Sequence, residues 1–177
     1  PLYVDWIHRL PNNHILPVDS SIVHHRAPSP EVQTVVHLHG AHVSSEFDGF
    51  PTECRVRTQG NNSHLYRYRN DQEGGWTLAH DHCFGITRLN VQAGLILPYR
   101  ITSPDQESVL PQGEFDIPLI IKDFDFFANG YLAYPTKENE DISGHRPSVI
   151  PEYFGGVLTV NGKAWPAIDA KRAIYRF

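Results

Sequence analysis

Two His-x-His pairs carry the chemistry that this sequence is expected to perform. The first pair is His37-Leu38-His39, and the second, 43 positions later, is His80-Asp81-His82. In a β-strand, residues i and i+2 point to the same face of the sheet, so each pair would aim two imidazoles at one side of its strand. If the two strands are neighbours, the four rings meet in one volume. Because neutral imidazole suits copper, zinc, iron and nickel, the pattern predicts a metal site without naming the metal.

Other histidines lack this pairing and are expected to be surface or hydrogen-bonded core residues. They are His8, His14, His24, His25, His64 and His145. One alternative within metal chemistry stays open, because His-x-His also begins hydrolase sites that hold two zinc ions. Such sites need bridging carboxylates and an activated water, and the acids close to the pairs are Asp48 and Asp81.

Two cysteines, Cys54 and Cys83, are too few for a disulfide scaffold, and their spacing does not match a zinc ribbon. The sequence favours two small buried thiols and leaves a single bridge between them open. Cys83 follows His82 directly, which also leaves open a role as a soft metal ligand.

The elements that must position these residues are short. The chain has 177 residues, of which 40% are hydrophobic, with 14 prolines and 13 glycines. This composition favours many short strands joined by turns. Strands are predicted within residues 33–39, 63–69, 76–82, 115–121 and 157–163, the last running into an Asn-Gly turn. Residues 88–102 predict a helical turn and then a buried strand, 102–108 a polar linker, and 137–147 a polar loop. The prediction is an all-β chain with a break near residue 105.

Composition also excludes some partners. The net charge is −5 and the basic residues form no block, so nucleic acid is not expected. No apolar run is long enough for a transmembrane helix, and no membrane association is expected. The chain contains no methionine and shows no signal peptide, which is typical of a processed product or a fragment.

The surroundings of the histidine pairs resemble the multicopper oxidases. One segment resembles the first copper motif of that family: Val35-Val36-His37-Leu38-His39-Gly40 followed by Phe47-Asp48-Gly49-Phe50-Pro51. Another, from Ala79-His80-Asp81-His82-Cys83 to Gly94-Leu95, resembles the second copper motif. Residues 10–19 and 160–166 add a likeness to the bacterial spore-coat laccase and bilirubin oxidase branch. Two departures are Leu78-Ala79, where the family usually has Trp-Tyr, and Cys83-Phe84, where Ala-Met is common.

The resemblance implies a fold of cupredoxin domains, each a Greek-key β-sandwich. Residues 1–104 would be the first domain without its opening strands, 105–113 a linker, and 114–177 the beginning of the second domain. The family's cluster of three coppers uses eight histidines from two domains. By position, His37 would bind the type 2 copper, and His39, His80 and His82 the type 3 coppers.

Further roles also follow from the resemblance. Asp48 would be the acid that helps supply protons, although Asp-Gly at 48–49 is also a common turn step. The type 1 copper would lie outside the chain, which has no His-Cys-His segment. The implied activity is one-electron oxidation of phenols, aromatic amines or bilin-type pigments coupled to reduction of dioxygen to water.

The expected partners are dioxygen, a small aromatic reductant and the remaining cupredoxin domains. A secreted, periplasmic or spore-coat location is compatible with this activity. The chain alone is expected to be catalytically incomplete. The alternatives that remain are a cupredoxin-like copper-binding module without turnover and the metal hydrolase.

Overall fold

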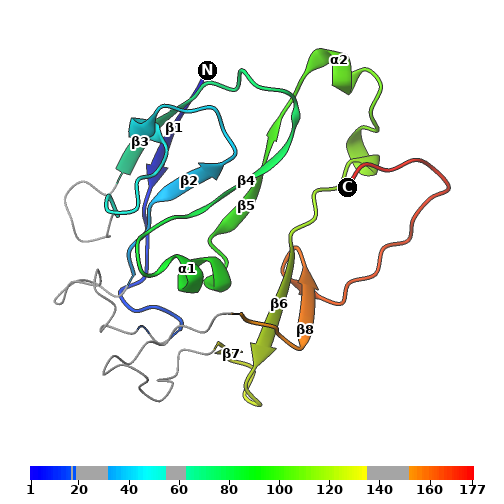
Figure 1. The fold of residues 1–177 in the computed structure, drawn as a ribbon. Coiled ribbons are helices and arrows are strands. Elements are labelled where there is room, and N and C mark those ends of the chain that lie inside the picture. Colours follow the sequence, from blue (N-terminus) through cyan, green and yellow to red (C-terminus); the bar gives the residue numbers. More distant parts are fainter. Residues whose placement is uncertain (17, 19–31, 55–62, 135–151) are drawn as a thin grey trace.

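Strands dominate the computed structural model, which describes residues 1–16, 18, 32–54, 63–134 and 152–177 (Figure 1). The strands are β1 (Leu2–Ile7), β2 (Val36–His39), β3 (Ser63–Tyr68), β4 (Gly75–Asp81), β5 (Ile96–Ile101), β6 (Ile121–Phe126), β7 (Leu132–Ala133), β8 (Val157–Val160) and β9 (Lys163–Ala164). The helical elements are α1 (Thr87–Ala93), α2 (Pro104–Glu107) and the 3-10 turns η1 (Ser45–Phe47) and η2 (Gly113–Phe115). The predicted all-β class is confirmed.

Two antiparallel sheets form a sandwich that carries the histidine pairs. One sheet has the order β1-β3 and the other β2-β4-β5. Although β3 lies between β2 and β4 in the sequence, it pairs in the opposite sheet, so the chain crosses between sheets as in a Greek key. Leu38 and Ala79 from one sheet pack against Tyr66 and Tyr68 from the other, and all four are buried. This core fixes which face of β2 and β4 points outward.

The region between the second histidine pair and β5 folds as the sequence predicts. Helix α1 ends at Gly94, whose φ of 112° is a left-handed conformation that favours glycine. The Gly94 N–H donates to the carbonyls of Asn90 and Val91 and so satisfies the end of the helix. Strand β5 follows and pairs with β4. The predicted helical turn and strand within 88–102 are therefore confirmed, but the predicted burial of the strand is wrong, because only Ile101 of β5 is buried and Leu97 is exposed.

Other predicted elements differ from the structure. The strand predicted at 115–121 is wrong, because η2 ends there and β6 begins only at Ile121. Pro118 lacks an N–H to donate to a ladder, which weakens a strand at this point. The predicted linker 102–108 contains α2, while β1 was not predicted from the sequence. The predicted loop at 137–147 lies outside the described residues.

A third sheet, in the order β7-β6-β8-β9, lies beyond α2 in the sequence. The predicted Asn-Gly turn is confirmed, since Asn161 and Gly162 have φ values of 50° and 79° between β8 and β9. Lys122 on β6 donates its ammonium to the carbonyls of Val91 and Gln92, at the end of α1. Burial lowers the pKa of Lys122. This contact ties the third sheet to the helix that follows the histidines.

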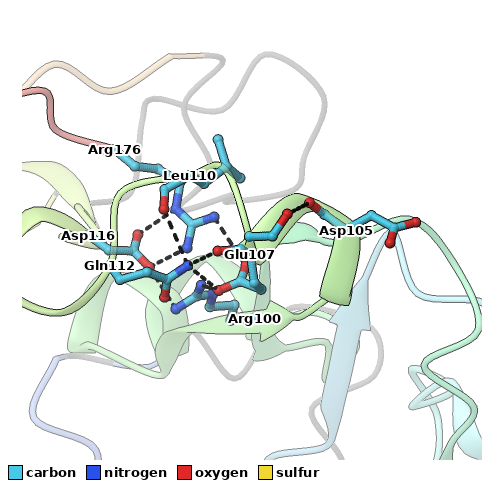
Figure 2. A network of polar contacts seen from close by, with 8 residues as sticks. Arg100, Asp105, Glu107, Leu110, Gln112, Asp116 and Arg176 are labelled. Carbon is cyan, nitrogen blue, oxygen red and sulfur yellow. Dashed lines mark hydrogen bonds and ion pairs between the residues drawn. The ribbon is translucent and has the colours of Figure 1, made fainter.

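A network of charged side chains surrounds the residues predicted as a linker (Figure 2). Arg100 on β5 pairs with Glu107 on α2 and lies 2.6 Å from the carboxylate of Asp116. Arg176 pairs with Asp116 and lies 3.3 Å from Glu107. Gln112 adds hydrogen bonds to Glu107. The network connects β5 with the last residues of the chain, and the domain boundaries at 104 and 114 remain a prediction.

Among the described residues, the helices are too short and too polar to cross a bilayer.

We expect Glu107→Gln to change how stability depends on pH. Hydrogen bonds from Arg100, Gln112 and Arg176 lower the pKa of Glu107 from 4.5 to about 2. A carboxylate whose pKa is lowered by folding contributes stability above its unfolded pKa and loses it as the pH falls through the folded value. The difference in thermal midpoint between wild type and Glu107→Gln should therefore be largest near neutral pH and shrink between about pH 4.5 and pH 2.

The matched control is Glu114→Gln, which removes an exposed pair with Lys171. An exposed ion pair contributes little, so this variant should follow the wild-type curve at every pH. A pH-independent difference for Glu107→Gln would contradict the expectation.

Candidate metal centre

Strand pairing brings the two histidine pairs together. Strand β2 pairs with β4 in antiparallel register, with His37 directly opposite His80. Because Leu38 and Ala79 point into the core, the alternation along each strand turns His37, His39 and His80 to the other face. Their ring centroids lie 5.3–5.7 Å apart. One nitrogen from each of these rings can be chosen so that all lie within 4.8 Å of one another, which a shared metal site requires.

His82 lies just beyond the end of β4 and stands beside this group. Its ring stacks on His37 with a centroid distance of 4.5 Å and lies 5.8 Å from His80. The N–H of His82 donates to the carbonyl of Val35 at 2.9 Å, which extends the contact between the two segments past the strand end. The structure thus gathers all four histidines predicted as ligands, with His82 outside the tighter group of three.

Backbone carbonyls orient three of the four rings. The Nδ1 atoms of His37, His80 and His82 lie 2.6, 2.6 and 2.9 Å from the carbonyl oxygens of Asp48, Asp81 and Gly49, respectively. Because a carbonyl oxygen only accepts, each Nδ1 must be the protonated nitrogen, and Nε2 of the neutral ring keeps its lone pair. In metal sites, a hydrogen bond from the ring nitrogen that does not bind the metal fixes the tautomer and the orientation of the histidine. His39 differs, since its Nδ1 faces Nε2 of His80 at 3.3 Å.

Electrostatics favour the neutral, ligand-competent form of His80. Burial lowers its pKa, and the neighbouring rings of His37, His39 and His82 lower it further. The hydrogen bond to the Asp81 carbonyl acts in the opposite direction and is outweighed. The lowered pKa means that the His80 ring itself has little proton to lose when it binds a metal.

Asp81, which separates His80 from His82, turns its side chain into the core. Its carboxylate, with the residue only 2% exposed, accepts hydrogen bonds from the Thr34 hydroxyl at 2.7 Å and from the N–H groups of Val35 and Cys83 at 3.1 Å. These bonds join the residues before β2 to the residues after β4. Asp81 thus fixes the backbone on both sides of the ligands and offers no carboxylate to a metal.

The loop at Asp48 and Gly49 supplies two of the carbonyls. Gly49 has a φ of 75°, and a Cβ built on it would lie 2.0 Å from the carbonyl oxygen of Val36. Only glycine allows this close approach to β2. The Asp48 carboxylate lies 3.2 Å from Nδ1 of His37 and is about half exposed. Asp48 is therefore both a turn residue and a neighbour of the cluster, so the two readings of this residue do not exclude each other.

The expectation of two free thiols is wrong, because Cys54 and Cys83 form a disulfide with their Cα atoms 5.4 Å apart. The loop after β2 folds back on the residues after His82, where the Phe84 N–H donates to the Pro51 carbonyl at 2.9 Å. That fold-back was not visible in the sequence, and it is what brings the two cysteines together. As a disulfide sulfur, Cys83 cannot act as a thiolate ligand.

The histidines predicted not to be ligands lie in different surroundings. The His14 ring bonds the backbone of Leu16 and the side chain of Asn90, and His8 is buried. His64 lies on β3 in the other sheet. The predictions for His24, His25 and His145 concern residues outside the described part. Sequence reasoning missed the carbonyl acceptors and the role of Asp81, for which the only signal was an acidic residue between two paired histidines.

Comparisons with known proteins point to one family. No family model matches the chain. A laccase of Bacillus subtilis is 38% identical to it over 99% of this chain and 36% of its own length. Multicopper oxidase LPR1 of Arabidopsis thaliana is 40% identical over 99% of this chain and 31% of its own length. The chain therefore spans about a third of the length of the curated relatives it matches.

Solved structures agree with the sequence matches. The crystal structure of the McoA multicopper oxidase from Aquifex aeolicus superposes on this chain with a TM-score of 0.64 and 26% identity. The match covers 81% of this chain and 30% of the McoA chain. A laccase from Pediococcus acidilactici, at 22% identity and a TM-score of 0.58, shares the fold.

We expect Asp81→Asn to destabilise the protein by about 2 kcal/mol, the usual cost of losing hydrogen bonds to a buried charged group. The asparagine amide would place its NH2 group against a backbone N–H that now donates to the carboxylate, so one hydrogen bond would be replaced by two facing donors. Urea unfolding at neutral pH measures the change. The control Asp71→Asn alters an exposed pair with Arg69 and should cost less than about 1 kcal/mol. Equal effects of both variants would contradict this role of Asp81.

Proposed function

We propose that this chain, which belongs to the multicopper oxidase family, supplies histidine ligands to a copper centre at which dioxygen is reduced to water. The observation that carries the proposal is the placement of His37 opposite His80, with a backbone carbonyl holding Nδ1 of each ring. The donor set fits copper, because imidazole serves both of its common oxidation states.

The proposed roles follow the family motifs. His37 is assigned to the type 2 copper, and His39, His80 and His82 are assigned to type 3 coppers. When bound, copper would supply one-electron redox chemistry, which zinc cannot. Strands β2 and β4 hold His37, His39 and His80 on one face of a sheet, which restricts their movement more than loop positions would.

Asp48 is proposed to deliver protons. Reduction of dioxygen to water consumes four protons along with four electrons, so the centre needs a route from solvent. The Asp48 carboxylate is about half exposed and reaches within 3.2 Å of the His37 ring. It therefore joins solvent to the edge of the ligand group, where a carboxylate can take up and release a proton.

The electron donor is proposed to be a small aromatic compound: a phenol, an aromatic amine or a bilin-type pigment. The name laccase on the Bacillus relatives supports a laccase-like activity. The remaining cupredoxin domains of the protein would supply the other four histidines and the type 1 copper that accepts electrons from the substrate. Within the chain, residues 1–104 are proposed as the first cupredoxin domain and 114–177 as part of the second.

The hydrolase alternative is weakened by the placement of the two nearest acids. Asp81 directs its carboxylate to Thr34 and backbone N–H groups in the core. Asp48 lies against Nδ1 of His37, the nitrogen that a metal would not use. Neither acid is in position to bridge two zinc ions. The copper-binding module without turnover is separated from the oxidase by the test below.

We expect the full-length protein to bind copper at a coupled centre and His37→Ala to lose the type 2 signal. Metal analysis would count the copper, and electron spin resonance with absorption spectra would identify the centre. The control is His42→Ala, an exposed histidine near Asp71, which should bind copper as the wild type does. Zinc in place of copper would favour a hydrolase, and isolated copper without oxygen uptake would favour a binding module.

We expect Asp48→Asn to slow oxygen reduction at least tenfold while leaving the copper content unchanged, because general acid catalysis typically contributes a hundredfold or more. The amide keeps the shape of the side chain and its turn but cannot carry a proton. Oxygen uptake with a phenolic substrate, measured across pH, tests this. Unchanged turnover at every pH would leave Asp48 with a turn-forming role only.

A further inference from the structure

We propose that the Cys54–Cys83 disulfide is a positioning clamp for the metal centre. It holds the loop whose carbonyls orient His37 and His82, and breaking it loosens those two rings while leaving His39 and His80 in place. The claim that the disulfide orients the two rings is argued from contacts within the chain. The claim that it affects copper binding rests in addition on the copper site proposed above.

The bridge joins the orienting loop to the residue that follows His82. The loop supplies the acceptor carbonyls at Asp48 and Gly49, and Cys54 lies five residues after Gly49. Two hydrogen bonds run alongside the bridge: His82 Nδ1 to the Gly49 carbonyl, and the Phe84 N–H to the Pro51 carbonyl. The disulfide is the covalent member of these three links.

The two ends of the bridge are held very differently. Cys83 is 1% exposed, and its N–H donates to Asp81 while its carbonyl accepts from the Thr87 hydroxyl. Cys54 is only partly buried and belongs to no strand or helix. The loop is therefore the part released when the bridge opens, because Cys83 stays anchored by its own hydrogen bonds.

The effect should divide the four histidines into two classes. His37 and His82 depend on loop carbonyls for the orientation of their rings. His80 bonds the carbonyl of Asp81, within its own strand, and His39 faces His80. Release of the loop removes the acceptors of the first class and leaves the second class untouched. A purely structural staple would affect all four rings alike.

Opening the bridge is a two-electron reduction. A dithiol reductant gives up two electrons and two protons, the S–S bond breaks, and two S–H groups form on Cys54 and Cys83. The dithiol itself becomes a cyclic disulfide. The clamp therefore makes ligand orientation sensitive to thiol reductants.

The structural test uses the full-length, copper-free protein with 15N-labelled histidine. In the wild type, the Nδ1–H protons of His37, His80 and His82 should exchange slowly with water. In Cys54→Ser, those of His37 and His82 should exchange at least tenfold faster, and that of His80 should not change. Dithiol treatment of the copper-free wild type should reproduce the variant.

The control for general destabilisation is Ile101→Ala, a buried residue at the far end of β5. It should lower the thermal midpoint without changing the exchange of any of the three protons. If Cys54→Ser does not fold, the double variant Cys54→Ala/Cys83→Ala takes its place, since two alanines leave no unpaired thiol. Unchanged exchange at His37 and His82 in the folded variant, or equal acceleration at His80, would overturn the clamp.

Copper binding provides the second readout. Loss of outer hydrogen-bond partners typically weakens metal affinity 10–100-fold, so Cys54→Ser should lose copper to a chelator at roughly tenfold lower chelator concentration than the wild type. Unchanged copper affinity in a variant whose His37 and His82 Nδ1–H protons exchange faster would overturn the claim that the disulfide affects copper binding. A wild-type protein that binds no copper would instead contradict the proposed function, and the exchange experiment would still decide whether the disulfide orients the two rings.

Discussion

The antiparallel register of β2 against β4 is the constraint on which the metal centre depends. It places His37 opposite His80 and, one position along, Leu38 opposite Ala79. Because side chains alternate with a period of two, a slip of one residue would carry the histidines into the core and the apolar residues to the outer face. Burying imidazoles among Tyr66 and Tyr68 would cost far more than the present packing. The hydrophobic core thus selects the register, and the register assembles the ligands.

Two sets of contacts hold that register beyond the strands themselves. On the core side, the Asp81 carboxylate accepts hydrogen bonds from Thr34, Val35 and Cys83, and these bonds connect the start of β2 to the end of β4. On the outer side, the loop at Gly49 approaches the Val36 carbonyl closely enough that only glycine fits. The strands that carry the ligands are thus held by Asp81 on the core side and by the Gly49 loop on the outer side.

The sequence predicted the parts of the site that follow from local periodicity. His-x-His on a β-branched segment predicts two rings on one face, and the positions of α1, β5 and the turn at Asn161 follow equally from local signals. What it could not predict depends on contacts distant in the chain. The disulfide needs the fold-back of the loop onto Cys83, and the segment before Pro118 pairs with Arg176, 60 positions away, in an isolated β-bridge. Local pattern carries no information about such partners.

The position of the disulfide explains why a single bridge can matter to both sheets. Cys54 and Cys83 are 29 residues apart, and the segment between them contains β3 of one sheet and β4 of the other. Closing a loop of that length reduces the entropy of the unfolded chain by an amount worth about 3.5 kcal/mol, which favours the folded arrangement of the two sheets. Strand β4 ends at Asp81, and beyond it a single backbone hydrogen bond, from the His82 N–H to the Val35 carbonyl, continues the pairing to that ligand. The disulfide at the next residue, Cys83, adds a covalent restraint to that last hydrogen bond.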